Sequence, residues 1–158
     1  MLERNLRALS RVNPRLAQII AQTPARPDAK FARADDGALT GTVGTDVERA
    51  LASRRRPLDE ARRFAQSVDP KAAAIFVVGG FGLGHHVLAL GERLAMTGLV
   101  VVYEPDVALL RAVLERTDLS PVLGGSKAVG GASSGGAVAG VGGVGGRMNV
   151  AILHDAQD

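Results

Sequence analysis

One stretch of the sequence, IFVVGGFGLGH from Ile75 to His85, limits the folds open to this chain more than any other feature. A short β-branched and aromatic run, typical of a buried strand, leads directly into four closely spaced glycines. A helical apolar pattern follows, and a second hydrophobic run, Leu99–Tyr103, ends on Glu104. Strand, glycine turn, helix and second strand in this order predict a parallel α/β unit whose glycine turn lies near the acidic strand end.

This order is typical of the opening unit of a Rossmann-like nucleotide-binding fold. We therefore expect an α/β protein in which residues 73–123 form a partial parallel sheet with its helices, the first of them over about Leu83–Thr97. The Pro105-Asp106 pair is expected to open the second helix of this unit.

Residues 1–72 are predicted to be an N-terminal helical region that precedes the sheet. Asn13-Pro14 is a helix start with asparagine as the N-cap, and Pro57 starts a further helix. Between these helices the pattern indicates only a weak strand at Leu39–Val43 and a short helical turn at Val47–Ala52.

Residues 124–158 have a different composition from the rest of the chain. Eleven of the twenty-three residues from 124 to 146 are glycine, and most others are Ala, Val or Ser. Such a segment buries too little apolar area to offset its conformational entropy, so we expect a disordered Gly-rich tail. Val150–Leu153 is a candidate for a final strand within it.

Composition excludes several classes of protein. There is no cysteine and only three histidines, so thiolate sites are excluded and no metal centre is expected. Arginines near the start argue against a secretory signal, and no apolar run suits a membrane span, so we expect a soluble cytoplasmic protein without a membrane partner.

Charge is unevenly placed along the chain. Residues 1–72 carry fourteen Lys or Arg against nine Asp or Glu, whereas the remainder carries five against seven. A basic half favours an anionic partner such as a nucleotide or phosphate. Aromatic residues make up only 3% of the chain, which argues against single-stranded nucleic acid as the partner.

The glycines of the turn are the first candidates for ligand binding: Gly79, Gly80, Gly82 and Gly84. Without a Cβ, such residues let a phosphate or ribose approach the strand-to-helix turn, where free N–H groups are available. Their G-x-G-x-G spacing is similar to the glycine loop of S-adenosylmethionine-dependent methyltransferases. His85 replaces the lysine and His86 the serine or threonine that a P-loop requires, which argues against a nucleoside triphosphatase. Alternatively, the glycines only permit a tight turn.

Other candidate side chains lie around this turn. At the end of the second strand, Glu104 could accept both hydroxyls of a ribose, or it could be an exposed strand-end residue. His85 is predicted to contact the ligand as a neutral hydrogen-bonding group, with His86 a weaker candidate. The Arg54-Arg55-Arg56 run could clamp a phosphate or could be solvated.

Taken together, these features resemble the N-terminal part of the motility-associated factor family, the flagellin glycosyltransferases. The matching elements cover residues 1–123: Asn5–Ile20, the helix entry Ser53–Ala61, GFGLGHH from Gly80, Glu104-Pro105-Asp106, and the helix that follows as far as Pro121. Family members often carry an aromatic residue after GFGLG, where this chain has His85-His86.

The resemblance implies a role in transferring nonulosonic sugars from a cytidine-monophosphate donor to flagellin. In the family this chemistry is associated with a central domain beyond the part matched here, so no residue of this chain is assigned to glycosyl transfer. We expect an N-terminal domain, a truncated copy or a degenerate member, with a nucleotide-sugar as ligand and flagellin or a missing catalytic domain as partner. A methyltransferase-like domain that binds an adenosyl ligand, and a purely structural module, are the alternatives. The identity of the cofactor stays open.

Overall fold

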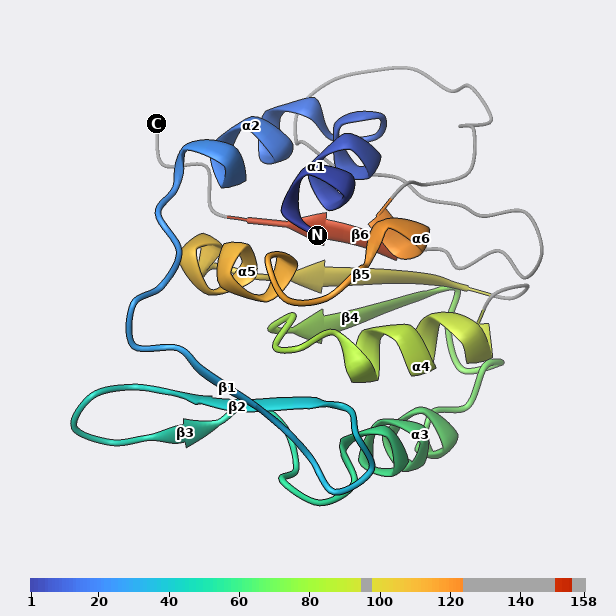
Figure 1. Cartoon of the computed structure of the whole chain (residues 1–158). Helices are drawn as coiled ribbons and strands as arrows, with labels where there is room; N and C mark the ends of the chain where they lie inside the picture. Colours follow the sequence, from blue (N-terminus) through green and yellow to red (C-terminus); the bar gives the residue numbers. More distant parts are fainter. Residues whose placement is uncertain (95–97, 124–149, 155–158) are drawn as a thin grey trace.

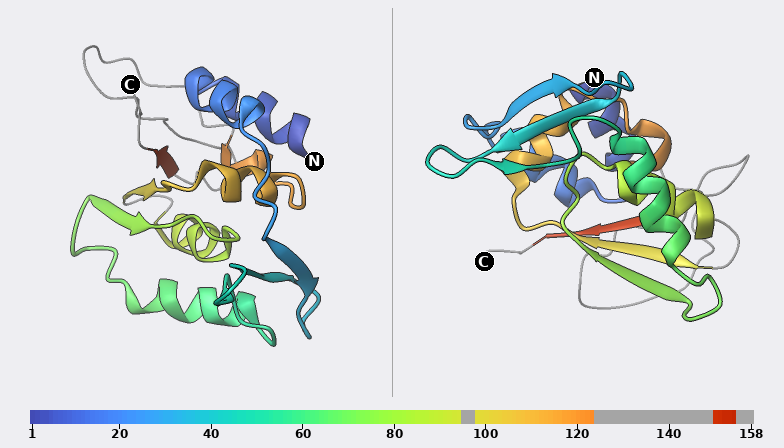
Figure 2. Two further views of the ribbon diagram at one scale, coloured as in Figure 1. Left: turned by 90° about the vertical axis from the view of Figure 1, so that its left-hand side faces the viewer. Right: turned by 90° about the horizontal axis from the view of Figure 1, so that it is seen from below.

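The computed structural model describes residues 1–94, 98–123 and 150–154 and confirms the α/β fold class (Figure 1). Its centre is a parallel three-stranded sheet of β4 (Ile75–Gly79), β5 (Leu99–Tyr103) and β6 (Val150–Leu153), in the order β4-β5-β6. The two views of Figure 2 show the described helices on one side of this sheet. Such an arrangement is one half of a Rossmann-like fold.

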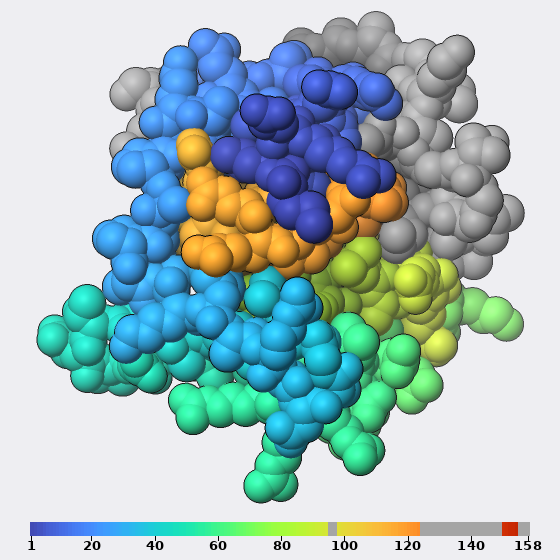
Figure 3. Space-filling model, viewed as in Figure 1, coloured from blue at the N-terminus to red at the C-terminus, as the bar shows by residue number. Residues whose placement is uncertain are grey.

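Two short helices begin the chain, and the second begins at the predicted Asn13-Pro14 pair. They are α1 (Leu2–Ser10) and α2 (Pro14–Gln22). The side-chain oxygen of Asn13 accepts a hydrogen bond from the Leu16 N–H at 2.9 Å, so Asn13 is the predicted N-cap of α2. In the space-filling view, α1 lies against the segment that contains α5 and α6 (Figure 3).

Residues 30–50 differ from the prediction of a mainly helical region. They form an antiparallel sheet of β1 (Lys30–Arg33), β2 (Leu39–Val43) and β3 (Arg49–Ala50). The strand at Leu39–Val43 is confirmed, but the helical turn at Val47–Ala52 is wrong. Thr42 pairs with Ala50 instead, and the Leu51 N–H continues the pairing to the Gly41 carbonyl at 2.9 Å. The cause is Gly44, whose φ of +114° turns the chain back along β2.

Helix α3 (Pro57–Ser67) begins at its predicted proline and packs along α4 (His85–Leu94). The sequence predicts that α4 begins near Leu83. It begins at His85 instead, because Gly84 has a φ of +82°, which a helix cannot contain. The predicted end of this helix at Thr97 lies outside the described residues.

Helices α5 (Val107–Leu114) and α6 (Ser120–Leu123) follow β5, and the predicted last strand is confirmed as β6. Strand β6 pairs in parallel with β5, with Val100 opposite Val150 and Tyr103 opposite Leu153. The predicted disordered tail lies outside the described residues except for β6 and His154. No helix in the described part of the chain is long and apolar enough to cross a membrane.

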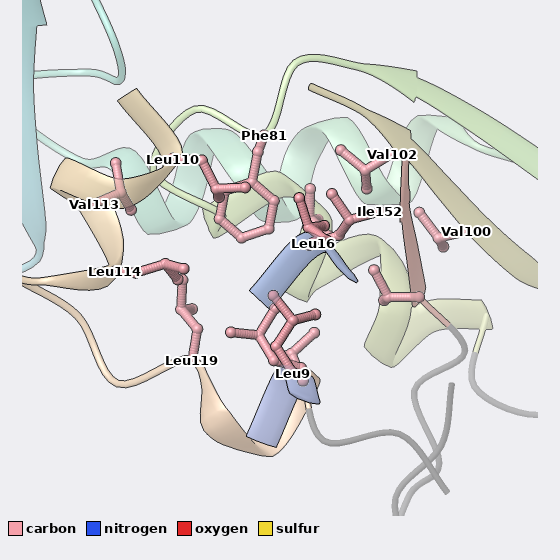
Figure 4. Close-up of a cluster of buried hydrophobic side chains, with 14 of the residues drawn as sticks. Leu9, Leu16, Phe81, Val100, Val102, Leu110, Val113, Leu114, Leu119 and Ile152 are labelled. Atoms are coloured by element: carbon pink, nitrogen blue, oxygen red, sulfur yellow. The ribbon is translucent and has the colours of Figure 1, made fainter. Parts of the chain in front are cut away.

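The hydrophobic core lies between the covered face of the parallel sheet and the helices (Figure 4). Val100, Val102 and Ile152 project from the strands toward leucines of the helices, and Phe81 enters from the glycine turn. Buried Asn5 joins α1 to this layer: its amide nitrogen donates to the Leu114 and Thr117 carbonyls, and its oxygen accepts from the Leu119 N–H. The glycine turn is part of this core, because its residues Phe81 and Leu83 are buried in it.

Candidate functional site

The glycine turn connects the carboxyl end of β4 to the first residue of α4. Three of its glycines adopt left-handed backbone conformations, with φ of +85° at Gly80, +52° at Gly82 and +82° at Gly84. Residues with a Cβ rarely adopt these conformations. The alternation of glycine with Phe81 and Leu83 therefore has a structural cause, because the two apolar side chains enter the core while the glycines reverse the backbone.

One glycine of the turn lacks that explanation. Gly79 is exposed, has no left-handed φ, and a Cβ built on it would meet no atom within 4 Å. A Cβ built on Gly80 would also meet no atom within 4 Å, whereas a Cβ on Gly84 would lie 3.0 Å from the Phe81 ring. The carboxyl end of β4 is therefore open to approach from outside.

Glu104 is brought to the glycine turn, as the sequence predicts, but the residue is only 4% exposed and its carboxylate is used by the chain itself. One oxygen accepts a hydrogen bond from the Phe81 N–H at 2.7 Å, and the other accepts from the Asp106 N–H at 2.8 Å. The side chain thus ties the glycine turn to the loop that opens α5. A ribose would have to share these oxygens with two backbone donors.

His85 and His86 occupy the first turn of α4, and each binds a backbone carbonyl. His85 Nε2 lies 2.8 Å from the Leu39 oxygen of β2, and His86 Nε2 lies 3.3 Å from the Gly80 oxygen. Because a carbonyl only accepts, Nε2 is the protonated nitrogen of both rings. Burial lowers the pKa of His86, which favours its neutral form. The His85 ring therefore ties the start of α4 to β2, and the His86 ring ties it to the glycine turn.

The three arginines of the basic run separate in the fold. Arg54 lines a cavity of about 590 Å³ between α3, residues 50–53 and the start of α4. Arg55 and Arg56 line a different hollow, together with three aspartates. A single phosphate clamp formed by all three is therefore not present in this arrangement.

Two polar features near the sheet edge were not predicted from the sequence. Arg26 forms ion pairs with Asp28 and with Asp106, and these raise the pKa of its guanidinium, Asp28 having the larger effect. Asp106 also caps α5 by accepting from the Leu109 N–H at 2.8 Å. His154 follows β6, and its buried Nε2 has no hydrogen-bond partner among the described residues. In the sequence, the only signal for His154 is its position directly after the strand candidate Val150–Leu153.

Among the described residues, no group of three or more His, Asp or Glu side chains is placed to hold a metal ion. Comparison with protein-family models, with curated proteins and with solved structures finds no match to this chain.

Proposed function

We propose that this chain is the N-terminal, non-catalytic domain of a flagellin-glycosyltransferase-like protein of the motility-associated factor type, and that it acts by docking against a catalytic domain. The observation that carries the docking role is an apolar face of β4 and the adjoining part of β5 that none of the described helices covers. The resemblance in GFGLGHH and Glu104-Pro105-Asp106 supports the choice of family.

This β4–β5 face is defined by side chains that alternate with those of the core. On β4, Ile75 is 57% exposed and Val77 is 73% exposed. The strand register places them beside Leu99 and Val101 of β5, so all four share one face. Parallel sheets in proteins are almost always covered on both faces. None of the described helices lies on this side, so a face of this kind is suited to a partner domain.

The contacts of the motif residues support a non-catalytic role. The Glu104 carboxylate, the turn glycines and both adjacent histidines are engaged in holding the strand-turn-helix unit together. A group that acts on a substrate needs an accessible atom within hydrogen-bond reach of it. Residues 79–86 and Glu104 therefore fit a domain that positions another domain better than one that carries out the transfer.

A domain exchange tests this proposal. The corresponding N-terminal region of a motility-associated factor transferase is replaced by this chain, and the flagellin of the host cell is analysed by intact-mass spectrometry. We expect the chimera to add nonulosonic sugar to flagellin, and deletion of the N-terminal region to abolish the addition. A chimera that folds, accumulates to normal levels and leaves flagellin unmodified would overturn the proposal.

A second candidate function, binding of an adenosyl ligand, is favoured by the open space beside Gly79 and Gly80. In Rossmann-like folds the ligand lies at the carboxyl ends of the strands, where these glycines are placed. A thermal-shift assay with S-adenosylmethionine and S-adenosylhomocysteine tests it, with cytidine monophosphate and NAD as comparators. An upward shift with the adenosyl ligands alone, lost in Gly79→Val, supports this candidate; no shift with either ligand excludes it.

A further inference from the structure

We infer that the cavity between α3 and the first turn of α4 binds a small planar ring that carries both an amino group and an anionic group. This site is separate from the glycine turn and goes beyond the proposed docking function. Neither the turn glycines nor Glu104 lines it.

The size and walls of the cavity suit a small ligand. Its volume is about 590 Å³, within the range of about 300–1,000 Å³ that is typical of ligand pockets. Small apolar residues form much of the wall, namely Ala50, Leu51, Ala52, Pro57 and Ala61. His85 and His86, which follow the glycine turn, also line it. Apolar walls with a few polar groups are the usual composition of such sites.

An aromatic side chain is available for stacking. Phe64 of α3 lines the cavity and is 43% exposed, although most large apolar side chains of this protein are buried. Its ring meets the His86 ring edge-on, with centroids 5.9 Å apart and an interplanar angle of 89°. This contact fixes the orientation of Phe64, and a planar ligand can cover the part of the ring that remains exposed.

Two charged groups of opposite sign line the same cavity. The guanidinium of Arg54 makes no salt bridge or hydrogen bond with the described residues; together with Lys30, which has the larger effect, its charge lowers the pKa of Glu48. Arg54 can therefore still pair with an anion in the cavity. One oxygen of Glu60 accepts from the Ser53 N–H at 3.0 Å, which leaves its other oxygen for a donor such as an amino group. An amino-substituted ring with an anionic group satisfies both charges.

Two common sources share this chemistry: a purine nucleotide and an aromatic amino acid. We therefore use adenosine monophosphate and L-tryptophan as probes, with adenosine and inorganic phosphate as partial probes. Binding is followed by NMR on isotope-labelled protein, through the ring resonances of Phe64, His85 and His86. His154 lies outside the cavity and provides the internal reference.

We expect at least one complete probe to produce saturable shifts at Phe64 and His86 that exceed those at His154. The probe that binds identifies the source of the ligand. If adenosine monophosphate binds, adenosine and inorganic phosphate should each bind at least tenfold more weakly. Arg54→Gln should weaken binding about tenfold or more, as expected for a charge-assisted hydrogen bond. Arg63→Gln is the matched control, because Arg63 lies on α3 but outside this cavity, and it should leave affinity unchanged.

Three results would overturn the inference. The first is the absence of saturable shifts with both complete probes at millimolar concentration. The second is equal affinity in Arg54→Gln and the unsubstituted protein. The third is unchanged affinity in Phe64→Leu, provided that circular dichroism shows this variant to be folded.

Discussion

Replacing Glu104 by glutamine should destabilise the protein because the glycine turn depends on both carboxylate oxygens. The carboxylate accepts from Phe81 N–H and Asp106 N–H, and it is almost fully buried. Glutamine has one acceptor oxygen, so one bond is lost and an N–H donor of the side chain faces a backbone donor. A hydrogen bond to a charged group contributes about 1.5–3 kcal/mol, and an unsatisfied buried donor costs about 1–3 kcal/mol. We expect the free energy of unfolding to fall by about 3 kcal/mol.

The assay is urea unfolding followed by far-ultraviolet circular dichroism, because the chain has no tryptophan. Glu92→Gln is the matched control: it removes a carboxylate from an exposed position of α4 and should change stability by less than about 0.5 kcal/mol. If Glu104→Gln behaves like the control, the carboxylate does not hold the turn and the structural role assigned to it is refuted.

Further predictions concern the turn, the histidine beside it and the helix layer. Gly84→Ala should cost about 2 kcal/mol in the same unfolding assay because of its left-handed φ and its closeness to the Phe81 ring, whereas Gly79→Ala should be nearly neutral. Burial lowers the pKa of His86, so protonation of this ring favours the unfolded chain. The free energy of unfolding should therefore be highest above a pH of about 6.5, the ordinary pKa of histidine, and should fall as the pH decreases below it. Thermal melting curves between pH 7.5 and 5.5 should show a smaller decrease in His86→Gln. Asn5→Ala removes three hydrogen bonds, two of them buried, and should lower the free energy of unfolding by about 3 kcal/mol, measured by urea unfolding.

Features of local origin were predictable from the sequence. The central strand-turn-helix-strand unit follows from hydrophobic runs and glycines that are adjacent in the chain, and the starts of α2 and α3 follow from Asn13 and Pro57. Strand β6 was predicted at Val150–Leu153 because its four residues are apolar, although its pairing with β5 crosses a long sequence separation.

Features that depend on distant contacts were not predictable in the same way. Strand β3 has two exposed residues, and it exists because Gly44 turns it back onto β2. The position of Glu104 at a strand end was predicted correctly, but its partner Phe81 lies 23 residues away and reaches it only through the parallel pairing. The cavity beside Phe64 arises from the packing of α3 on α4, and neither helix shows it in its own sequence pattern.

The central claim is that the β4–β5 face, which none of the described helices covers, docks this domain against a catalytic domain. Val77 on that face and Val47 in the β2–β3 connection are both 73% exposed, so Val77→Lys and Val47→Lys form a matched pair with little expected effect on folding. The decisive measurement is the mass of flagellin made with the transferase chimera that carries each substitution. We predict that Val77→Lys leaves flagellin unmodified while Val47→Lys preserves the sugar. Equal modification of flagellin by both variants would contradict the claim.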